Sequence, residues 1–147
     1  MKTFNVLFLC TGNSARSILA EALITTMSQG KLIGYSAGSH PKGVVHPIAL
    51  ELSIEMGYPK EKLRSKSWNE YSHPEAPKMD FIITVCDNAK GEVCPIWPGH
   101  PATLHWRLPD PALARGSHKE QKKVFCDVQN QLKEKIQTLI NLTQYTN

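Results

Sequence analysis

Apolar residues in this chain form short continuous runs that alternate with stretches of helical spacing. The runs predict four buried strands, at residues 6–9, 31–37, 81–85 and 103–106. Apolar positions three or four apart predict helices at about residues 15–29 and 47–56, and from 117 into the C-terminal region. This alternation of strands and helices favours an open parallel sheet.

The last predicted helix is the longest. Ser117 and Glu120 stand before it at the spacing of a capping box, in which each side chain accepts a hydrogen bond from the other residue's backbone. The apolar stripe expected to pack on the sheet consists of Val124, Phe125, Val128, Leu132, Ile136 and Leu139. The 147 residues contain no repeat or linker. They therefore predict a single α/β domain over residues 1–147, with an open four-stranded parallel sheet and helices on both faces.

A short segment between the first strand and the first helix contains the most reactive combination of residues. It reads Cys10, Thr11, Gly12, Asn13, Ser14, Ala15, Arg16 and Ser17. A loop of this length curls so that its N–H groups converge on an anion, and the N-terminus of the next helix adds unpaired donors. Gly12 and Asn13 tolerate the positive φ that we expect such a curl to need.

These residues favour an anion site in which Cys10 is the nucleophile. Converging N–H dipoles and Arg16 stabilise a thiolate over a thiol, and a guanidinium forms two hydrogen bonds to a tetrahedral oxyanion. The alternative is a buried core cysteine near an ordinary helix arginine. The glycine, asparagine and serine between the two residues favour the anion site.

Asp110 is the candidate general acid. Pro109 and Pro111 restrict its backbone, which suits a carboxyl group held over the anion to protonate a departing oxygen. The alternative is a polar turn, because Asp next to Pro is common in turns. Cys10, Cys86 and Asp110 all follow predicted strands, and open parallel sheets bind ligands at the carboxyl ends of their strands.

The loop resembles the phosphate loop of the low-molecular-weight protein tyrosine phosphatase superfamily, which includes arsenate reductases of the same fold. Residues 86–99, His105-Trp106, the segment after Asp110 and the turn at residues 36–38 resemble the arsenate reductase branch. The resemblance covers most of the chain. It implies a low-molecular-weight phosphatase-like fold and an enzyme of arsenical resistance. Such an enzyme reduces arsenate to arsenite with an external thioredoxin or glutaredoxin system and without a bound cofactor.

The resemblance also implies a role for each site residue. Cys10 is the nucleophile, Arg16 stabilises the transition state and Asp110 is the acid. The residues that cradle the oxyanion are Thr11, Gly12, Asn13, Ser14, Ala15 and Ser17. Cys86 and Cys94 carry the disulfide.

A relay through Cys86 and Cys94 requires a particular geometry. Cys86 lies just past the third strand, where its thiol can attack a Cys10–arsenic adduct and release arsenite, after which Cys94 attacks Cys86. If residues 87–93 were helical, the two cysteines would be ~12 Å apart along the axis, whereas a disulfide tolerates about 7 Å between Cα atoms. Pairing therefore needs a loop or a helix that unwinds. The alternative is a buried apolar Cys86 and an unpaired Cys94 in a loop.

The chain departs from the family pattern at its cysteines. The two later cysteines stand one residue farther apart than in the thioredoxin-coupled members, which leaves open the reductant and the use of Cys94. Ala15 occupies the position where the tyrosine phosphatases often carry a second loop cysteine.

A further departure concerns a cation site. Some members of the reductase branch hold a potassium ion beside the loop, and Asn13, Glu21 and Ser36 match its ligands. Residues 64–67 lack the expected aspartate. We therefore expect no metal other than a weak monovalent cation site at these three residues, with Lys66 as the alternative source of positive charge.

Two other functions compete with arsenate reduction. A tyrosine phosphatase would use the same Cys10, Arg16 and Asp110 through a phosphocysteine that water hydrolyses. That branch usually places aromatic residues after the Asp-Pro pair, whereas residues 112–114 here are Ala-Leu-Ala. A binding module would hold phosphate or sulfate without turnover, which leaves both the nucleophile and the acid unexplained.

The charge composition indicates which kinds of ligand the protein binds. Seventeen basic and 13 acidic residues give a net charge of +4 with no basic run, which suits an anionic substrate and argues against nucleic acid. The first apolar run is too short for a signal peptide and no stretch is long enough for a membrane span. The four cysteines do not resemble a disulfide framework, which favours a reducing cytoplasm. We also expect a monomer. Cys126 and the six histidines are assigned no catalytic role.

Overall fold

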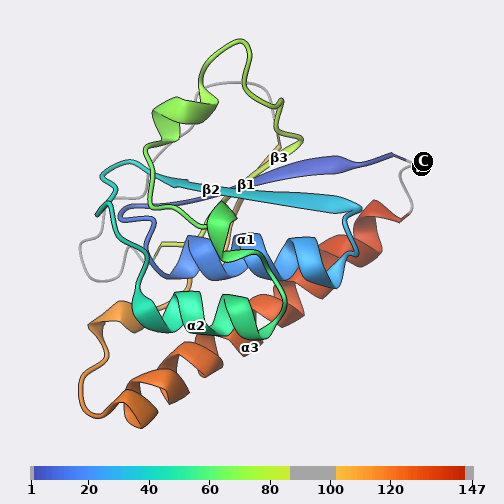
Figure 1. The fold of residues 1–147 in the computed structure, drawn as a ribbon. Helices are drawn as coiled ribbons and strands as arrows, with labels where there is room; N and C mark the ends of the chain where they lie inside the picture. Colours follow the sequence, from blue (N-terminus) through green and yellow to red (C-terminus); the bar gives the residue numbers. More distant parts are fainter. Residues whose placement is uncertain (1, 87–101, 145–147) are drawn as a thin grey trace.

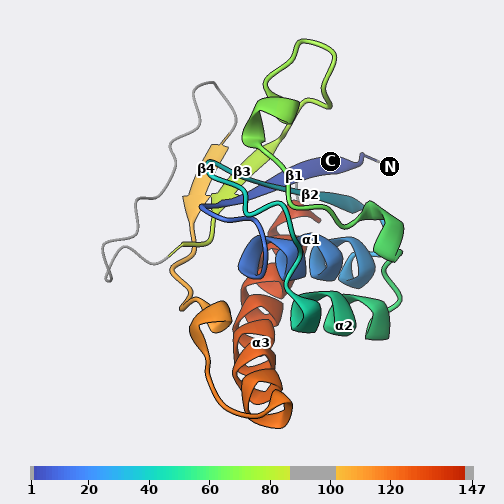
Figure 2. The ribbon, with the colours of Figure 1, turned by 60° about the vertical axis from the view of Figure 1, so that its left-hand side comes forward.

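The chain folds around one parallel sheet in the computed structural model, which describes residues 2–86 and 102–144. The strands are β1 (Phe4–Cys10), β2 (Leu32–Gly38), β3 (Phe81–Thr84) and β4 (Ala102–His105). Their order is β2-β1-β3-β4, every neighbouring pair is parallel, and β4 lies beside β3 away from β1 (Figure 2). The predicted four-stranded parallel sheet is confirmed.

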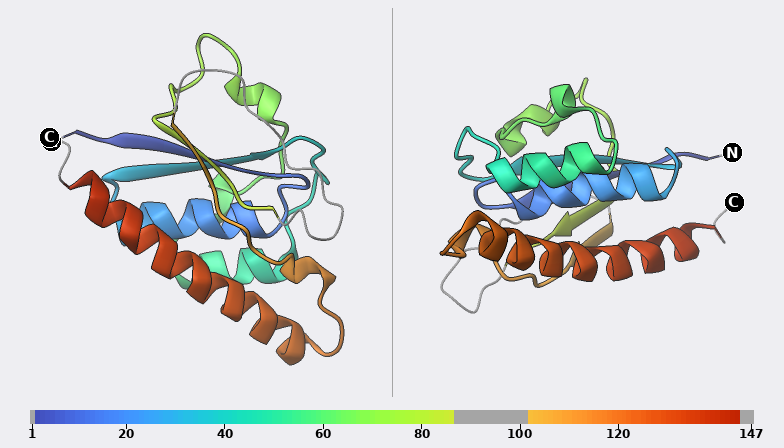
Figure 3. Two further views of the ribbon diagram at one scale, coloured as in Figure 1. Left: turned by 180° about the vertical axis from the view of Figure 1, so that it is seen from behind. Right: turned by 60° about the horizontal axis from the view of Figure 1, so that its bottom comes forward.

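Helical segments cover both faces of the sheet. The described residues form the α-helices α1 (Arg16–Met27), α2 (Pro47–Glu55) and α3 (His118–Thr143), which lie together on one face (Figure 1). The opposite face carries the 3-10 helix η2 (Trp68–Tyr71), as the turned views show (Figure 3). Two more 3-10 helices are η1 (Lys60–Lys62) and η4 (Pro111–Leu113).

Strand β1 is buried on both sides. Val6 and Phe8 belong to the large core cluster shared with the α-helices, whereas Leu7 and Leu9 belong to a smaller cluster that packs against Trp68 and neighbouring aromatic residues. Burial on both faces is typical of a central strand in a parallel sheet. It holds the carboxyl end of β1, and with it Cys10, in a fixed place.

Helix α3 begins as the sequence predicts. The Ser117 hydroxyl accepts a hydrogen bond from the Glu120 N–H at 3.1 Å, and the Glu120 carboxylate accepts one from the Ser117 N–H at 3.2 Å. The predicted stripe is wrong at Val124, which is 38% exposed, whereas Phe125 is fully buried. Successive helix residues are about 100° apart, so these two neighbours cannot both face the sheet. Within the described residues, no helix combines the length and apolar character needed to cross a membrane.

Candidate active site

The loop between β1 and α1 forms the wall of a cavity of about 180 Å³ at the carboxyl edge of the sheet. The lining residues are Cys10, Thr11, Gly12, Asn13, Ser14, Ala15, Arg16, His40, Lys42 and Asp110. Helix α1 starts at this loop with no side-chain cap on Ala15 and no acidic residue in its first turn. Its N-terminal donors and positive dipole end are therefore available to an anion in the cavity.

Cys10 lies at the base of the cavity and is 2% exposed. Its sulfur accepts a hydrogen bond from the Asn13 backbone N–H at 3.1 Å and lies 2.9 Å from the Ser17 hydroxyl oxygen. A thiolate can only accept hydrogen bonds, so Ser17 donates to it. Both contacts fix the position of the sulfur relative to the loop. Ser17, which we predicted to cradle the oxyanion, does not line the cavity and contacts the sulfur instead.

A chain of polar contacts fixes the direction of the Ser17 hydrogen bond. The Lys66 backbone N–H can only donate, and it donates to Asn13 Oδ1 at 2.9 Å. This orients the amide so that Asn13 Nδ2 donates to Ser17 Oγ at 2.8 Å, which leaves the hydroxyl proton of Ser17 for Cys10. Asn13 and Ser17 are both fully buried, so water does not compete with this chain.

The curl of the loop depends on Asn13 rather than on both residues we predicted. Asn13 has φ of 46°, whereas Gly12 does not adopt a positive φ. The absence of a side chain at Gly12 leaves room for Lys42: a Cβ there would lie 3.1 to 3.4 Å from three carbon atoms of the Lys42 side chain. The Gly12 carbonyl accepts hydrogen bonds from the Lys42 N–H at 3.0 Å and the Ser65 hydroxyl at 3.1 Å.

Arg16 and Asp110 meet at the side of the cavity. Arg16 is the first residue of α1 and is 4% exposed; its Nη1 donates to the Leu108 carbonyl at 3.1 Å. Its Nη2 lies 3.7 Å from Asp110 Oδ2. The other carboxylate oxygen, Oδ1, accepts from the Ala112 N–H at 3.0 Å and caps η4. One carboxylate oxygen of Asp110 therefore builds the turn, while the other faces Arg16.

His46 ties α2 to the loop. Its N–H donates to the Ser14 carbonyl at 2.9 Å, and its Nδ1 accepts from the Ile48 N–H at 3.1 Å as the N-cap of α2. Burial lowers the pKa of His46; the charge of Lys42 lowers it further, and Asp110 opposes both. The neutral ring is therefore the form that caps the helix.

The predicted redox cysteines are only partly described. Leu9 is paired with Thr84, the last residue of β3, so Cys86 follows the end of β3 at the edge of the sheet where Cys10 ends β1. Cys86 is fully buried and disulfide-bonded, whereas Cys10 and Cys126 are free. Cys94 lies outside the described residues.

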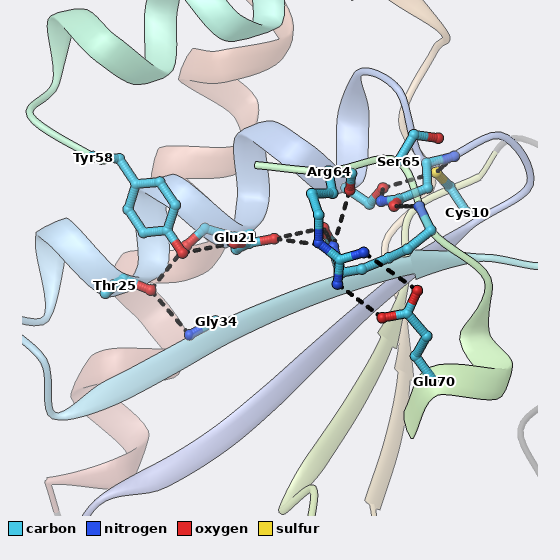
Figure 4. A network of polar contacts seen from close by, with 12 residues as sticks. Cys10, Glu21, Thr25, Gly34, Tyr58, Arg64, Ser65 and Glu70 are labelled. Atoms are coloured by element: carbon cyan, nitrogen blue, oxygen red, sulfur yellow. Dashed lines mark hydrogen bonds and ion pairs between the residues drawn. The ribbon is translucent and has the colours of Figure 1, made fainter. Parts of the chain in front are cut away.

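A buried charge cluster lies on the other side of the loop, where we predicted a weak cation site. Glu21 accepts hydrogen bonds from the Ser36 and Tyr58 hydroxyls, each at 2.6 Å. Lys66 Nζ lies 3.9 Å from Glu21 Oε1 and 3.5 Å from Ser36 Oγ. Figure 4 follows this network from Tyr58 through Glu21 toward the loop that carries Cys10.

The ammonium of Lys66 therefore brings its own positive charge to the cluster of Glu21 and Ser36. Burial raises the pKa of Glu21, against the lowering effect of Lys66, and burial lowers the pKa of Lys66, against the raising effect of Glu21. The described residues contain no group of three or more His, Cys, Asp or Glu side chains arranged to hold a metal ion.

Sequence reasoning did not find His40, Lys42 or the Leu108 carbonyl as parts of the site. His40 and Lys42 come from the loop after β2, and Leu108 precedes η4. No periodicity or motif marks these positions. Only the parallel pairing of β1 and β2, which sets Cys10 beside Gly38, brings the loop after β2 to the cavity.

Comparison with known proteins gives a consistent picture. The low molecular weight phosphotyrosine protein phosphatase family matches residues 5–145. A protein of Halalkalibacterium halodurans named arsenate reductase is 33% identical over 133 residues, which covers 90% of this chain and 92% of the relative.

Solved structures agree with this match. A structure described as an arsenate reductase in the phosphate binding state has a TM-score of 0.69 and 26% identity, and the match covers 96% of this chain and 98% of that one. The thioredoxin-dependent arsenate reductase of Corynebacterium glutamicum has a TM-score of 0.62 and 25% identity, with 97% of this chain and 64% of that one covered.

Proposed function

This chain belongs to the low molecular weight phosphotyrosine protein phosphatase family, and we propose that within it the protein reduces arsenate to arsenite. One observation carries the proposal. A cysteine that lines an anion cavity, Cys10, has a second cysteine, Cys86, at the same edge of the sheet, two residues after the end of the neighbouring strand β3. A phosphatase needs only the first of these, whereas a thiol-dependent reductase needs both.

The first step is a displacement at arsenic. The Cys10 thiolate attacks arsenate held by the loop N–H groups and Arg16, a sulfur–arsenic bond forms, and one arsenic–oxygen bond breaks. Asp110 gives its proton to the departing oxygen, which leaves as water. The hydrogen bonds from Asn13 and Ser17 hold the sulfur below the cavity in position for attack.

The second step transfers two electrons to arsenic. The Cys86 thiolate attacks the Cys10 sulfur, the sulfur–arsenic bond breaks with its electron pair on arsenic, and arsenite leaves. Cys94 then attacks Cys86, which frees Cys10 and leaves a Cys86–Cys94 disulfide. The bonded form of Cys86 and the free Cys10 and Cys126 support this order of events.

An external dithiol then reduces the Cys86–Cys94 disulfide, so the cycle needs no bound cofactor. The thioredoxin-dependent relative favours thioredoxin as this donor, with glutaredoxin as the alternative. A cycle that returns to free thiols suits a reducing compartment such as the cytoplasm.

Arsenate-dependent NADPH oxidation tests the proposal, with thioredoxin and glutaredoxin systems supplied separately. We expect turnover with one system and its loss in Cys10→Ser, Cys86→Ser and Cys94→Ser, while Cys126→Ser, the matched control, retains it. Turnover that needs glutathione and glutaredoxin and survives Cys94→Ser would keep the reductase and remove Cys94. Absence of turnover with both systems would reject arsenate reduction.

Tyrosine phosphatase activity is the second candidate, because the anion cavity, Arg16 and Asp110 serve phosphate equally well. The residues after Asp110 are small or aliphatic, and Leu113 is 60% exposed with no aromatic neighbour in η4 to hold a phenyl ring. We therefore expect only weak hydrolysis of aryl phosphates. Brisk hydrolysis that requires Cys10 and Asp110, without arsenate reduction, would favour this candidate.

A further inference from the structure

Lys42 lies on the anion loop, although neither the nucleophile nor the acid needs it. Its backbone N–H donates to the Gly12 carbonyl at 3.0 Å. Its side-chain carbons Cγ, Cδ and Cε all lie within 3.4 Å of the place where a Cβ on Gly12 would be. Because Gly12 has no side chain, the aliphatic stem of Lys42 packs against it, and Lys42 lines the anion cavity.

The ammonium of Lys42 is available to an anion. Lys42 is exposed, and among the described residues no carboxylate forms an ion pair with it. Lys42 and Asp110 both line the cavity and shift the pKa of His46 in opposite directions. Both charges therefore lie near the same imidazole, and Lys42 and the acid both line the cavity that receives the anion.

The geometry of attack decides which oxygen reaches Lys42. When Cys10 attacks from the base of the cavity, three oxygens of a tetrahedral anion turn toward the loop and Arg16, and the fourth points outward toward Asp110. In a free oxyanion this outer oxygen is unsubstituted and accepts a charge-assisted hydrogen bond. In a phosphate ester it carries a carbon group, which has to pass through the mouth beside Lys42.

We propose that Lys42 is a specificity-determining residue that selects a free tetrahedral oxyanion over a phosphate ester. Its ammonium binds the outer oxygen of the free anion, and its stem on Gly12 narrows the exit that an ester group needs. The inference rests on the proposed function for the identity of the substrate, arsenate. Its effect on anion binding does not depend on arsenate turnover.

Binding measurements in a Cys10→Ser background test the effect of Lys42 on anion binding separately from arsenate turnover. Inorganic phosphate and phenyl phosphate are titrated calorimetrically into Lys42→Met, which keeps the stem and removes the charge, and into Lys42→Arg, which keeps the charge. We expect Lys42→Met to raise the Kd for inorganic phosphate about tenfold, the size of one charge-assisted hydrogen bond, with the Kd for phenyl phosphate within about twofold. Lys42→Arg retains most of the affinity.

Lys133→Met is the matched control, because Lys133 is exposed on α3 and does not line the cavity. Equal weakening of both ligands in Lys42→Met, or a similar loss in Lys133→Met, would reduce the effect to net charge and overturn the proposal. Unchanged phosphate affinity would overturn it as well.

Steady-state kinetics with arsenate provide a second test of Lys42. They also distinguish a failure of the Lys42 proposal from a failure of the proposed arsenate reduction. In the enzyme with Cys10, Lys42→Met should raise KM for arsenate about tenfold and change kcat by less than about threefold, because the contact holds substrate before and during attack. A fall in kcat with unchanged KM would point to a disturbed loop and contradict the proposal. Selective phosphate binding without any arsenite production would leave Lys42 as assigned and reject arsenate reduction.

Discussion

Gly38→Ala should disable the site through the backbone of the anion loop. Gly38 ends β2 opposite Cys10, and a Cβ at this position would lie 2.5 Å from the Thr11 carbonyl oxygen and 3.1 Å from Asn13 Cβ. Thr11 and Asn13 are both parts of the loop, and Asn13 donates directly to the Cys10 sulfur. The substitution therefore pushes on the residues that orient the nucleophile.

The expected loss of activity in Gly38→Ala follows from the distance by which the loop has to move. The Thr11 oxygen has to move from 2.5 Å to at least 3.0 Å, a shift of about 0.5 Å. A 1 Å misplacement in an active site costs about 100-fold in rate, so half of it costs roughly tenfold in kcat/KM. Overpacking of a well-packed site also costs about 1–3 kcal/mol of unfolding free energy.

Gly34→Ala is the matched control. A Cβ at Gly34 would lie 2.6 Å from the Glu21 carbonyl oxygen, an equally tight contact in the packing of α1 on β2. Gly34 lies four residues before Gly38, or ~13 Å along the strand, and is therefore remote from the loop. We expect urea denaturation to show similar destabilisation of both variants.

The assay is kcat/KM for arsenate at a temperature where both variants are folded, with kcat/KM for an aryl phosphate beside it. Gly38→Ala should lose about tenfold with both substrates, and Gly34→Ala should stay within about twofold of the wild type. Equal losses in the two variants would refute the argument, because the effect would then come from stability alone. A fully active Gly38→Ala would refute it more directly.

Three further outcomes are expected. Ser17→Ala removes a hydrogen bond to the Cys10 sulfur and should lower kcat/KM for arsenate about 10- to 100-fold, the size of one hydrogen bond to a charged group. The pKa of His46 is lowered from 6.5 in the folded state, so the unfolded state binds the proton more tightly. The free energy of unfolding should therefore fall as pH drops from neutral through 6.5. His46→Asn, which keeps a cap acceptor, should flatten this pH dependence when it is measured by urea unfolding. Lys66→Met leaves the buried Glu21 carboxylate without its positive partner and should cost about 3–5 kcal/mol of unfolding free energy. Because Lys66 supplies the positive charge of this cluster, the wild type should have the same activity and thermal midpoint in potassium and sodium chloride at equal ionic strength.

Local features of the fold could be predicted because they depend on neighbouring residues. The β-branched run that forms β3, the Ser117–Glu120 capping box and the loop from Cys10 to Arg16 all act within a few positions of the chain. Periodicity also identified the face of α3, except at Val124, where two adjacent apolar residues compete for one face.

The rest of the site depends on contacts that sequence patterns do not record. The sequence predicted a positive φ at Gly12, but Gly12 has none, and its bare Cα instead packs against the side chain of Lys42, which is thirty positions away. The Lys66 backbone sets the direction of the hydrogen bonds that reach Cys10 through Asn13. Parallel pairing of β1 and β2 brings the loop that carries Lys42 to the site, and the bridge between Gly38 and Ser67 brings Lys66 there; no local spacing carries that information.

A single-turnover experiment tests whether the protein reduces arsenate with its own thiols. Fully reduced protein, with all four cysteines as thiols, is mixed with excess arsenate and no external reductant, and arsenite and free thiols are counted. We expect about one arsenite per chain, the loss of two thiols with Cys10 and Cys126 remaining free, and no arsenite from Cys10→Ser. An unchanged thiol count without arsenite from the wild type would contradict this expectation.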